Sequence, residues 1–404
     1  MADKIKAEAA AKSGLVSQLA VTAPFTVAHF AHHLITALAV PLTTYIQPEF
    51  NLSYAQVGLL ITAFSLPYGL SQLPAGWLAD KVGRRILIVL SISGVALTGF
   101  LIGISNTYVM LFVLMILMGI VGGGYHPSAP PLILATVKPE NRARTMGFHM
   151  VGGSASHFLS PVIGGAIAAA WGWRASYIGI AVPAILFGIA FYLFLGRQGG
   201  IKDAEIAMKK SEADSGAKSS RLGHIFSLIF LSSYCQAIVI SLISFIPLYM
   251  VNTYGVNKGT AANLVALIYS AGLWASPLGG WVADKFGKLK ITLLICLVTG
   301  PLVYFLNIAP FGILTAIILL AIGVTIYVRS PVTEAYIVSQ TSARQRSTVL
   351  GFYYMGHQEG SALITPLIGY FVDRFGFGAS FTGAAIALTA VAVLFFVFLW
   401  RKGD

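Results

Sequence analysis

Long apolar runs separated by short polar segments fill the chain from residue 19 to residue 400. Each run holds roughly 20 or more mostly apolar residues, the length that a helix needs to cross the hydrocarbon core of a bilayer. The pattern predicts twelve membrane-spanning helices, near residues 19–46, 54–79, 85–105, 107–136, 144–170, 174–196, 222–251, 259–283, 289–308, 310–338, 347–371 and 377–400.

A polar segment separates these helices into two groups of six. Residues 197–221 are rich in Lys, Ser, Ala, Asp and Glu, which is typical of a solvated linker or of one amphipathic helix at the membrane surface. The chain is therefore predicted to be an all-α membrane protein with five parts. They are a cytoplasmic leader (1–18), a six-helix bundle (19–196), a cytoplasmic linker (197–221), a second six-helix bundle (222–400) and a cytoplasmic tail (401–404).

Composition agrees with a membrane protein. Hydrophobic residues make up 57% of the 404 residues, charged residues only 10%, and the mean hydropathy is +0.81. A soluble domain is about 25% charged, so this chain carries too little charge to cover a soluble surface of its size. Its net charge of +12 is scattered between apolar runs instead of forming one stripe, which speaks against a nucleic-acid partner.

The distribution of basic residues predicts the orientation. If the N-terminus is cytoplasmic, all but four of the 26 Lys and Arg residues fall on the cytoplasmic side, as the positive-inside rule requires. The exceptions are Arg174, Lys258 and Arg374 in outer loops and Arg329 within a helix. We expect a multi-pass protein of the cell membrane, by default a bacterial inner membrane, with both termini inside. The leader lacks the apolar stretch and cleavage site of a signal peptide.

The two halves of the chain repeat each other. The segment from Gly76 to Arg84, Gly-Trp-Leu-Ala-Asp-Lys-Val-Gly-Arg, recurs 204 residues later, from Gly280 to Lys288, as Gly-Trp-Val-Ala-Asp-Lys-Phe-Gly-Lys. Six helices return the chain to its starting side, so the halves are parallel repeats. Such halves surround a central site and can rock about it, which predicts alternating access.

The repeated loop resembles the signature loop of the major facilitator superfamily, Gly-x-Leu-x-Asp-Arg-x-Gly-Arg-Arg, here with Lys81 at the first basic position. The resemblance implies two pseudo-twofold-related six-helix bundles and a secondary transporter. It also implies a conformational latch that does not touch substrate, whose residues would be Gly76, Asp80, Gly83, Arg84 and Arg85. The alternative is simple anchoring of the loop by its basic residues.

Two further resemblances concern branches of the superfamily. Helix 5 holds Gly147, Ser156, Ser160-Pro161 and Gly164-Gly165, which is similar to a glycine-rich pattern of drug–proton antiporters, with serines replacing two glycines. The segment Gly122-Gly-Gly-Tyr-His-Pro127, together with a His-rich first helix, resembles the fosmidomycin-resistance branch. These resemblances imply proton-driven export of small anionic or amphipathic compounds.

Ionisable residues inside a bilayer are costly and are candidates for function. Arg329 lies within helix 10, and the resemblance implies that helices 1, 4, 7 and 10 line the cavity. His29 and His33 share a face of helix 1 with His32, and His126 in helix 4 lies almost opposite Arg329 in the repeat. The predicted substrate-binding residues are Arg329, His126, Tyr125, Tyr327, His29 and His33.

Arg329 cannot lose its charge, so it needs an acid or an anionic ligand. Glu334 lies about 140° away on the same helix, which leaves Glu359 of helix 11 as the better ion-pair partner. The two open interpretations are a structural Arg329–Glu359 pair and an anion site that uses Arg329 when substrate enters. Carboxylic acids and imidazoles can carry protons through a bilayer. The predicted proton-coupling residues are Glu359, Glu334, His126 and His357.

No metal site or cofactor is expected. His29, His32 and His33 could approach a metal, but no acid or Cys nearby in the sequence completes the ligand set. The leading hypothesis is a monomeric exporter of a small organic compound that uses the proton gradient as its energy source and has the substrate, protons and the lipid bilayer as its partners. The alternatives are a proton-coupled symporter that takes up an organic anion, and a non-transporting receptor or scaffold. An enzyme is disfavoured because no nucleotide-binding or nucleophile motif occurs.

Overall fold

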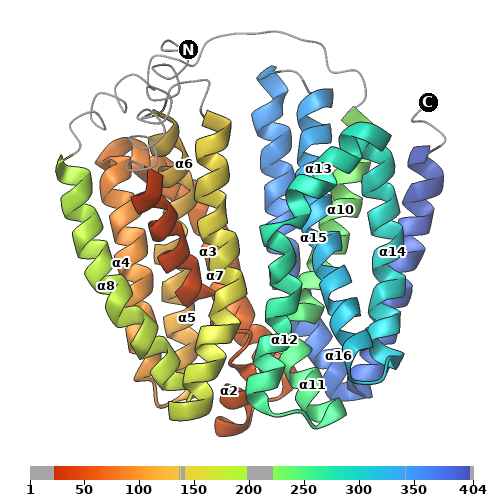
Figure 1. Ribbon diagram of the computed structural model, residues 1–404, viewed down its shortest axis with the longest axis horizontal. Helices are drawn as coiled ribbons and strands as arrows, with labels where there is room; N and C mark the ends of the chain where they lie inside the picture. The colour runs from red at the N-terminus through yellow and green to blue at the C-terminus, as the bar shows by residue number, and fades with distance from the viewer. Residues whose placement is uncertain (1–21, 136, 138–141, 198–221, 342, 401–404) are drawn as a thin grey trace, which may run out of the picture.

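The computed structural model describes residues 22–135, 137, 142–197, 222–341 and 343–400. Within these ranges the chain is almost entirely helical and contains no strand. The helices form two bundles, one from each half of the chain (Figure 1). The helix ends that border the leader, the linker and the tail, at residues 22, 197, 222 and 400, lie at one end of the molecule, here called the termini side (Figure 1).

The first bundle begins with a helix whose described part is residues 22–36. The elements that follow are α2 (Thr43–Glu49), α3 (Tyr54–Val82), α4 (Arg84–Gly103), α5 (Tyr108–Gly122), α6 (Tyr125–Ala135), α7 (Arg142–Trp171) and α8 (Trp173–Arg197). The first helix continues into α2 after turns at 37–42, and α5 continues into α6 after a short break at Gly123-Gly124. Each of these broken helices makes one pass across the bundle (Figure 1).

The second bundle has the same organisation. Its elements are α10 (Leu222–Ile243), α11 (Ile246–Tyr254), α12 (Lys258–Ser270), the short helix η2 (Ala271–Leu273), α13 (Ala275–Phe286), α14 (Lys288–Ile308), α15 (Ile313–Gln340) and α16 (Ala343–Trp400). The helix α10 continues into α11 and α12 into α13, while α16 is two helices joined at Gly376, where φ is 76°.

Six passes in each half confirm the predicted arrangement of twelve helices, with boundaries that differ from the prediction by a few residues. By length and composition alone, seven described helices could cross a membrane, or eight if the bent pair α12–α13 counts as one span. The predicted bounds of the leader, the linker and the tail fall on residues that lie almost wholly outside the described ranges, so those bounds remain predictions.

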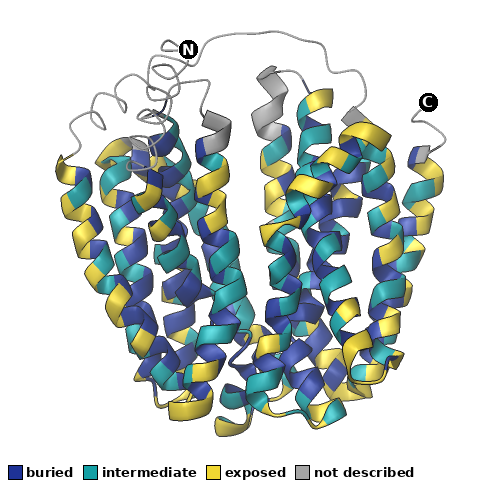
Figure 2. Cartoon of the chain, viewed as in Figure 1, coloured by how far each residue is buried: buried dark blue, intermediate teal, exposed yellow. Residues whose placement is uncertain are grey.

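Local sequence signals explain where several helices begin. Ser53 and Gln56 form a capping box at the start of α3, and Thr107 and Asn257 cap α5 and α12. These side chains satisfy backbone N–H groups that have no partner within the helix. Exposed positions (yellow in Figure 2) run along the outside of both bundles. Many of them carry large apolar side chains, as expected where the surrounding solvent is lipid rather than water.

The repeated loop turns at the same glycine in both halves. Gly83 has φ 95° and Gly287 has φ 96°, and these residues are separated by the repeat distance. L-residues with side chains avoid this conformation. The glycine of the signature therefore allows the chain to turn from α3 into α4 and from α13 into α14.

The two bundles contact each other closely along α3 and α16. At Gly58, an added Cβ atom would lie 2.8 Å from the Cα atom of Pro366, so only glycine allows this approach. The hydroxyl group of Thr62 donates to the carbonyl of Ala362 at 2.6 Å. A second contact joins α7 and α12, where a Cβ atom at Gly165 would lie 2.9 Å from that of Ala262. We call these two contacts the seam between the halves.

The seam ends part-way along the helices. Along α16, successive turns carry Ala362, Glu359, Met355 and Phe352 on one face. The first two contact α3, but Met355 and Phe352 are 53% and 50% exposed. On α3, Leu73 lies one turn beyond the last contact and is 77% exposed. The halves therefore meet at the side away from the termini and separate toward the termini side, as the ribbons in Figure 1 also show.

Asp373 joins the two halves at the end of the seam away from the termini side. Its two carboxylate oxygens accept hydrogen bonds from the backbone N–H groups of Tyr54 and Ala55 in the other half, each at 2.8 Å. These N–H groups belong to the first turn of α3, where they have no partner within the helix and where the helix dipole favours a negative charge. Asp373 thus stabilises the conformation in which this side is closed.

We expect Asp373→Ala to favour separation of the halves at this side. Loss of an exposed capping carboxylate costs about 0.5–1 kcal/mol, which raises the separated population roughly two- to fivefold. Electron paramagnetic resonance distances between spin labels at positions 106 and 311, in a chain lacking Cys235 and Cys296, measure that population. Asp284→Ala is the matched control, because Asp284 pairs with Lys288 within one half. An unchanged distance distribution in Asp373→Ala contradicts this role.

Candidate functional site

Six histidines gather inside the first bundle, and we call them the imidazole cluster. Their ring centroids lie 4.4 Å apart for His29 and His149, 4.9 Å for His29 and His33, and 5.0 Å for His33 and His157. The members come from the first helix, from α6 and from α7, and they are His29, His32, His33, His126, His149 and His157. The structure thus brings together three segments that are far apart in the sequence.

Backbone and aromatic contacts hold the cluster in place. The Nδ1 atom of His29 lies 3.0 Å from the carbonyl oxygen of His149, to which it can only donate. Gly153 makes room for the ring, because a Cβ atom there would lie 2.6 Å from Cε1 of His29. Tyr125 stacks on His29 and His32, and its hydroxyl donates to the carbonyl of Phe25 at 3.1 Å. Tyr125, predicted to bind substrate, is fully buried beneath the cluster.

Several ring nitrogens in the cluster are buried without a hydrogen-bond partner among the described residues. Both ring nitrogens of His32 and of His149 are in this position, as is Nδ1 of His157. Buried polar atoms are usually paired, and each exception requires an explanation. The imidazole cluster therefore has spare capacity to bind protons or a ligand.

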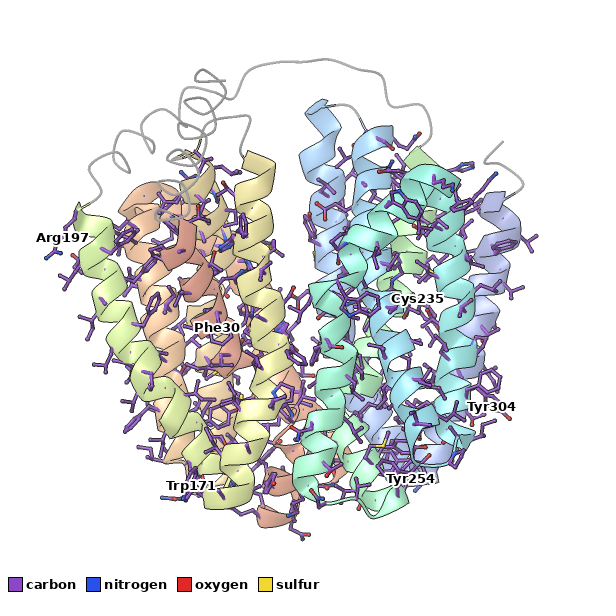
Figure 3. All side chains as sticks on the ribbon, viewed as in Figure 1. Phe30, Trp171, Arg197, Cys235, Tyr254 and Tyr304 are labelled. Carbon is purple, nitrogen blue, oxygen red and sulfur yellow. The ribbon has the colours of Figure 1, made fainter. Side chains whose placement is uncertain are left out.

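Arg329 occupies the interior of the second bundle and is 1% exposed. Its Nη2 atom donates a hydrogen bond to Oε1 of Gln236 on α10, while Nε and Nη1 are buried without a hydrogen-bond partner among the described residues. Cys235, which precedes Gln236 on α10, is labelled in Figure 3 and shows where Gln236 lies along the second bundle. No described carboxylate forms an ion pair with Arg329. The neighbours of its positive charge are neutral, namely the amide of Gln236 and the thiols of Cys235 and Cys296.

Of the two interpretations left open for Arg329, the structural Arg329–Glu359 ion pair is not formed among the described residues. Glu359 points across the seam to Gly69 of α3, where a Cβ atom would lie 1.1 Å from Oε1 of the glutamate. Its other oxygen, Oε2, is buried without a hydrogen-bond partner in the described part of the chain. Packing of α16 against the other half, rather than against α15, decides this orientation. Glu359 lies where the contact between α3 and α16 ends.

Other polar side chains lie near Arg329 in the second bundle. The hydroxyl of Tyr353 donates to the carbonyl of Ser330 at 3.2 Å, and Nε2 of His357 lies 3.4 Å from the hydroxyl oxygen of Ser330. Glu334, on the same helix as Arg329, is half-buried beside Tyr354. His357 thus lies on the second-bundle side, away from the imidazole cluster.

A tyrosine of the second bundle contacts the imidazole cluster. The ring of His157 lies 5.5 Å from that of Tyr269 on α12, a contact across the seam. Tyr327 packs against Gly272, where a Cβ atom would lie 2.8 Å from its ring. His126 and Arg329 belong to different bundles, and no described contact joins them. The structure thus contains an imidazole site and a guanidinium site on either side of the seam.

Of the predicted latch, the structure describes the backbone and the basic side chains. Gly76 faces Pro127, with 3.8 Å between its ideal Cβ position and that of the proline, and Arg84 begins α4. Nη2 of Arg85 donates to the carbonyl of Tyr192 at 3.0 Å, which ties the loop to α8. The side chain of Asp80 lies outside the described part, so the latch remains a prediction.

The sequence-based reasoning missed Gln236 and Tyr269. Gln236 is neutral, so it is not among the ionisable groups inside the apolar runs. An amide within an otherwise apolar helix is nonetheless expensive in lipid and forms hydrogen bonds with neighbouring helices. That signal could have identified Gln236 as a partner of Arg329. For Tyr269 the sequence offers no comparable signal, because aromatic residues are common in such helices.

Comparison with known proteins identifies the family. The sequence profile of the Major Facilitator Superfamily matches residues 25–324 and 225–404. Together with the twelve-helix fold, this match shows that the chain belongs to the major facilitator superfamily of membrane transporters.

Relatives within the superfamily differ in what they carry. The chain is 27% identical to the probable sulfoacetate transporter SauU of Cupriavidus necator, over 89% of this chain and 88% of the relative. It is 28% identical to the multidrug resistance protein MdtG of Klebsiella pneumoniae, over 79% and 76%. A bacterial homologue of the human lysosomal transporter Spinster, solved in an inward-facing and occupied conformation, shares the fold. The TM-score is 0.73, with 19% identity and 96% of each chain covered.

Proposed function

We propose that this protein is a secondary active transporter that moves a small organic anion by alternating access, coupled to protons. The observation that carries the proposal is the buried guanidinium of Arg329, which no described acid neutralises. A charge at membrane depth is costly and is retained for function. A planar guanidinium with free N–H groups binds carboxylate, sulfonate or phosphonate groups through paired hydrogen bonds. The resemblance to the probable sulfoacetate transporter SauU supports the same substrate class.

Proton coupling is assigned to Glu359, with Glu334, His126 and His357 as further candidates. The carboxyl group of Glu359 lies at the point where the seam ends, next to Gly69. A negative charge there is unpaired and costly in lipid, and protonation removes that cost. Protonation of Glu359 would therefore favour close contact between the halves, and its ionisation would favour separation. The proton gradient supplies the energy, without a cofactor.

The basic-residue distribution supports cytoplasmic termini. The proposed location is a bacterial inner membrane, in which the protein acts as a monomer. With that orientation, the separation of the halves toward the termini side corresponds to an inward-facing conformation. The role proposed for the protein is movement of substrate, without a chemical reaction. In the opposite, outward-facing conformation, the loop at Asp80 would act as the latch.

Transport can run in either of two directions, uptake or export. The resemblance to the multidrug resistance protein MdtG supports export. The substrates would then include amphipathic compounds, and the cycle would be proton antiport with a role in drug resistance. Uptake of an organic anion by proton symport uses the same two sites. In both directions Arg329 binds the anion and Glu359 carries the proton.

Transport in membrane vesicles tests the proposal. We expect radiolabelled sulfoacetate, or another small organic anion selected by thermal shift, to accumulate when a proton gradient is imposed, whereas a neutral analogue does not. Accumulation in right-side-out vesicles alone establishes uptake, and accumulation in inside-out vesicles alone establishes export. Binding of an anion without flux in either orientation contradicts the proposal and favours a receptor.

A further inference from the structure

Three members of the imidazole cluster are arranged as a ligand set for a metal ion. His29, His33 and His126 each offer a ring nitrogen, and these nitrogens all lie within 4.8 Å of one another. We propose that His29, His33 and His126 bind one divalent transition-metal ion of the class that prefers imidazole, such as Zn²⁺, Ni²⁺ or Co²⁺. The proposal concerns binding to the first bundle and does not depend on the transport function.

The hydrogen bond of His29 prepares its ring for a metal. Because Nδ1 can only donate its proton to the carbonyl of His149, the neutral ring has a free lone pair on Nε2. Metal-binding histidines typically donate their other N–H to a carbonyl or carboxylate, which fixes the tautomer and the orientation of the ring. His33 has a similar contact, with Nδ1 3.4 Å from the hydroxyl oxygen of Thr36.

The distance between the other two ligands fits a tetrahedral ion. Nε2 of His33 and Nε2 of His126 face each other at 3.2 Å. Two nitrogens that bind Zn²⁺ at 2.0–2.1 Å in tetrahedral geometry lie about 3.3 Å apart. Without a metal, one of the two rings must carry a proton on Nε2 to make this contact. With a metal, both lone pairs point to the same cation.

The residues around the three ligands also fit a transition-metal ion. The ring of His157 lies 5.0 Å from that of His33, so it is a candidate fourth ligand. His32, which the sequence places on the same face, is not among the three histidines whose ring nitrogens lie within 4.8 Å of one another, and His126 takes its place. Neutral imidazoles without a carboxylate suit transition metals better than Mg²⁺ or Ca²⁺, which require oxygen ligands.

The sequence predicted no metal site because it offered His29, His32 and His33 from one helix with no further ligand. The contribution of His126 depends on how α6 packs against the first helix. A bound dication in the first bundle would also place a second positive charge on the opposite side of the seam from Arg329.

Metal binding to purified protein tests this inference. The protein carries a purification tag without histidine, is stripped with a chelator and is titrated with Zn²⁺ by calorimetry and with Co²⁺ by visible absorption. We expect one ion per chain and the intense absorption of tetrahedral Co²⁺. His33→Gln and His126→Gln should each weaken binding more than tenfold, since loss of a ligand exceeds the effect of an outer partner.

Two histidines outside the proposed set provide matched controls. His224→Gln, near the start of α10, and His357→Gln, in the second bundle, should leave metal binding unchanged. Nitrogen hyperfine structure in the Cu²⁺ spectrum of the unaltered protein reports imidazole ligands even if a variant fails to fold. Absence of stoichiometric binding to the unaltered protein overturns the proposal, as does binding that persists in the folded His33→Gln and His126→Gln variants.

Discussion

Replacing Arg329 with glutamine is expected to reduce transport of the anionic substrate roughly 100-fold, because two or more charge-assisted hydrogen bonds are lost. The charge of Arg329 is held by neutral groups, the amide of Gln236 and the thiols of Cys235 and Cys296. Its removal eliminates a buried, unneutralised charge, so we expect the variant to fold and its melting temperature not to fall. Arg329→Lys keeps the charge but loses the planar donor geometry, and we expect intermediate transport.

A second variant separates anion binding from folding. Gln236→Glu places a carboxylate where the amide oxygen of Gln236 now accepts from Arg329, so an internal ion pair replaces the free charge. We expect this variant to be at least as stable as the unaltered protein and to bind the anion poorly. Arg197→Gln is the control, since Arg197 lies exposed at the end of α8 (Figure 3). Normal transport by Arg329→Gln would show that the anion binds elsewhere.

Replacing Glu359 with glutamine is expected to abolish concentrative transport while substrate exchange at equal pH persists. Glutamine resembles the protonated acid in shape and charge but cannot release a proton. The side chain contacts Gly69 where the halves begin to separate, so a permanently neutral group there should uncouple the movement of the halves from the proton gradient. Accumulation should fall to the equilibrium level, and exchange should lose its dependence on pH.

Matched experiments identify the role of Glu359. Counterflow without a pH gradient measures exchange, and accumulation under an imposed gradient measures coupling. Glu334→Gln is the internal comparison, because Glu334 is also half-buried in the second bundle but lies beside Tyr354 rather than at the seam. Concentrative transport that survives in Glu359→Gln but is lost in Glu334→Gln would assign proton coupling to Glu334. Survival in both variants would leave the histidines as carriers.

The metal proposal and the transport proposal make separate predictions. Metal binding is measured without flux, and anion transport is measured in chelator-treated vesicles and again after addition of Zn²⁺. If the metal contributes to anion binding, His33→Gln should lower affinity for the anion only in the presence of the ion. If the protein binds no metal but Arg329→Gln still loses transport, the anion site of the second bundle functions without a metal ion.

The sequence by itself determined the helices, the repeat and the family. Apolar length defined each pass because a bilayer imposes the same thickness on every helix. The repeated glycine at Gly83 and Gly287 marked the same turn in both halves, because only glycine adopts that backbone conformation without strain. These features are local, so the residues that cause them are neighbours in the chain.

Only the tertiary structure decided which polar groups meet. Helical spacing placed His29 and His33 on one face but could not show that His126 joins them. Helical spacing also allowed more than one partner for Arg329. In the structure, Arg329 donates to Gln236, and Glu359 lies across the seam against Gly69. The physical reason is that periodicity defines the faces of a helix, whereas the neighbour of each face depends on close packing between helices distant in sequence.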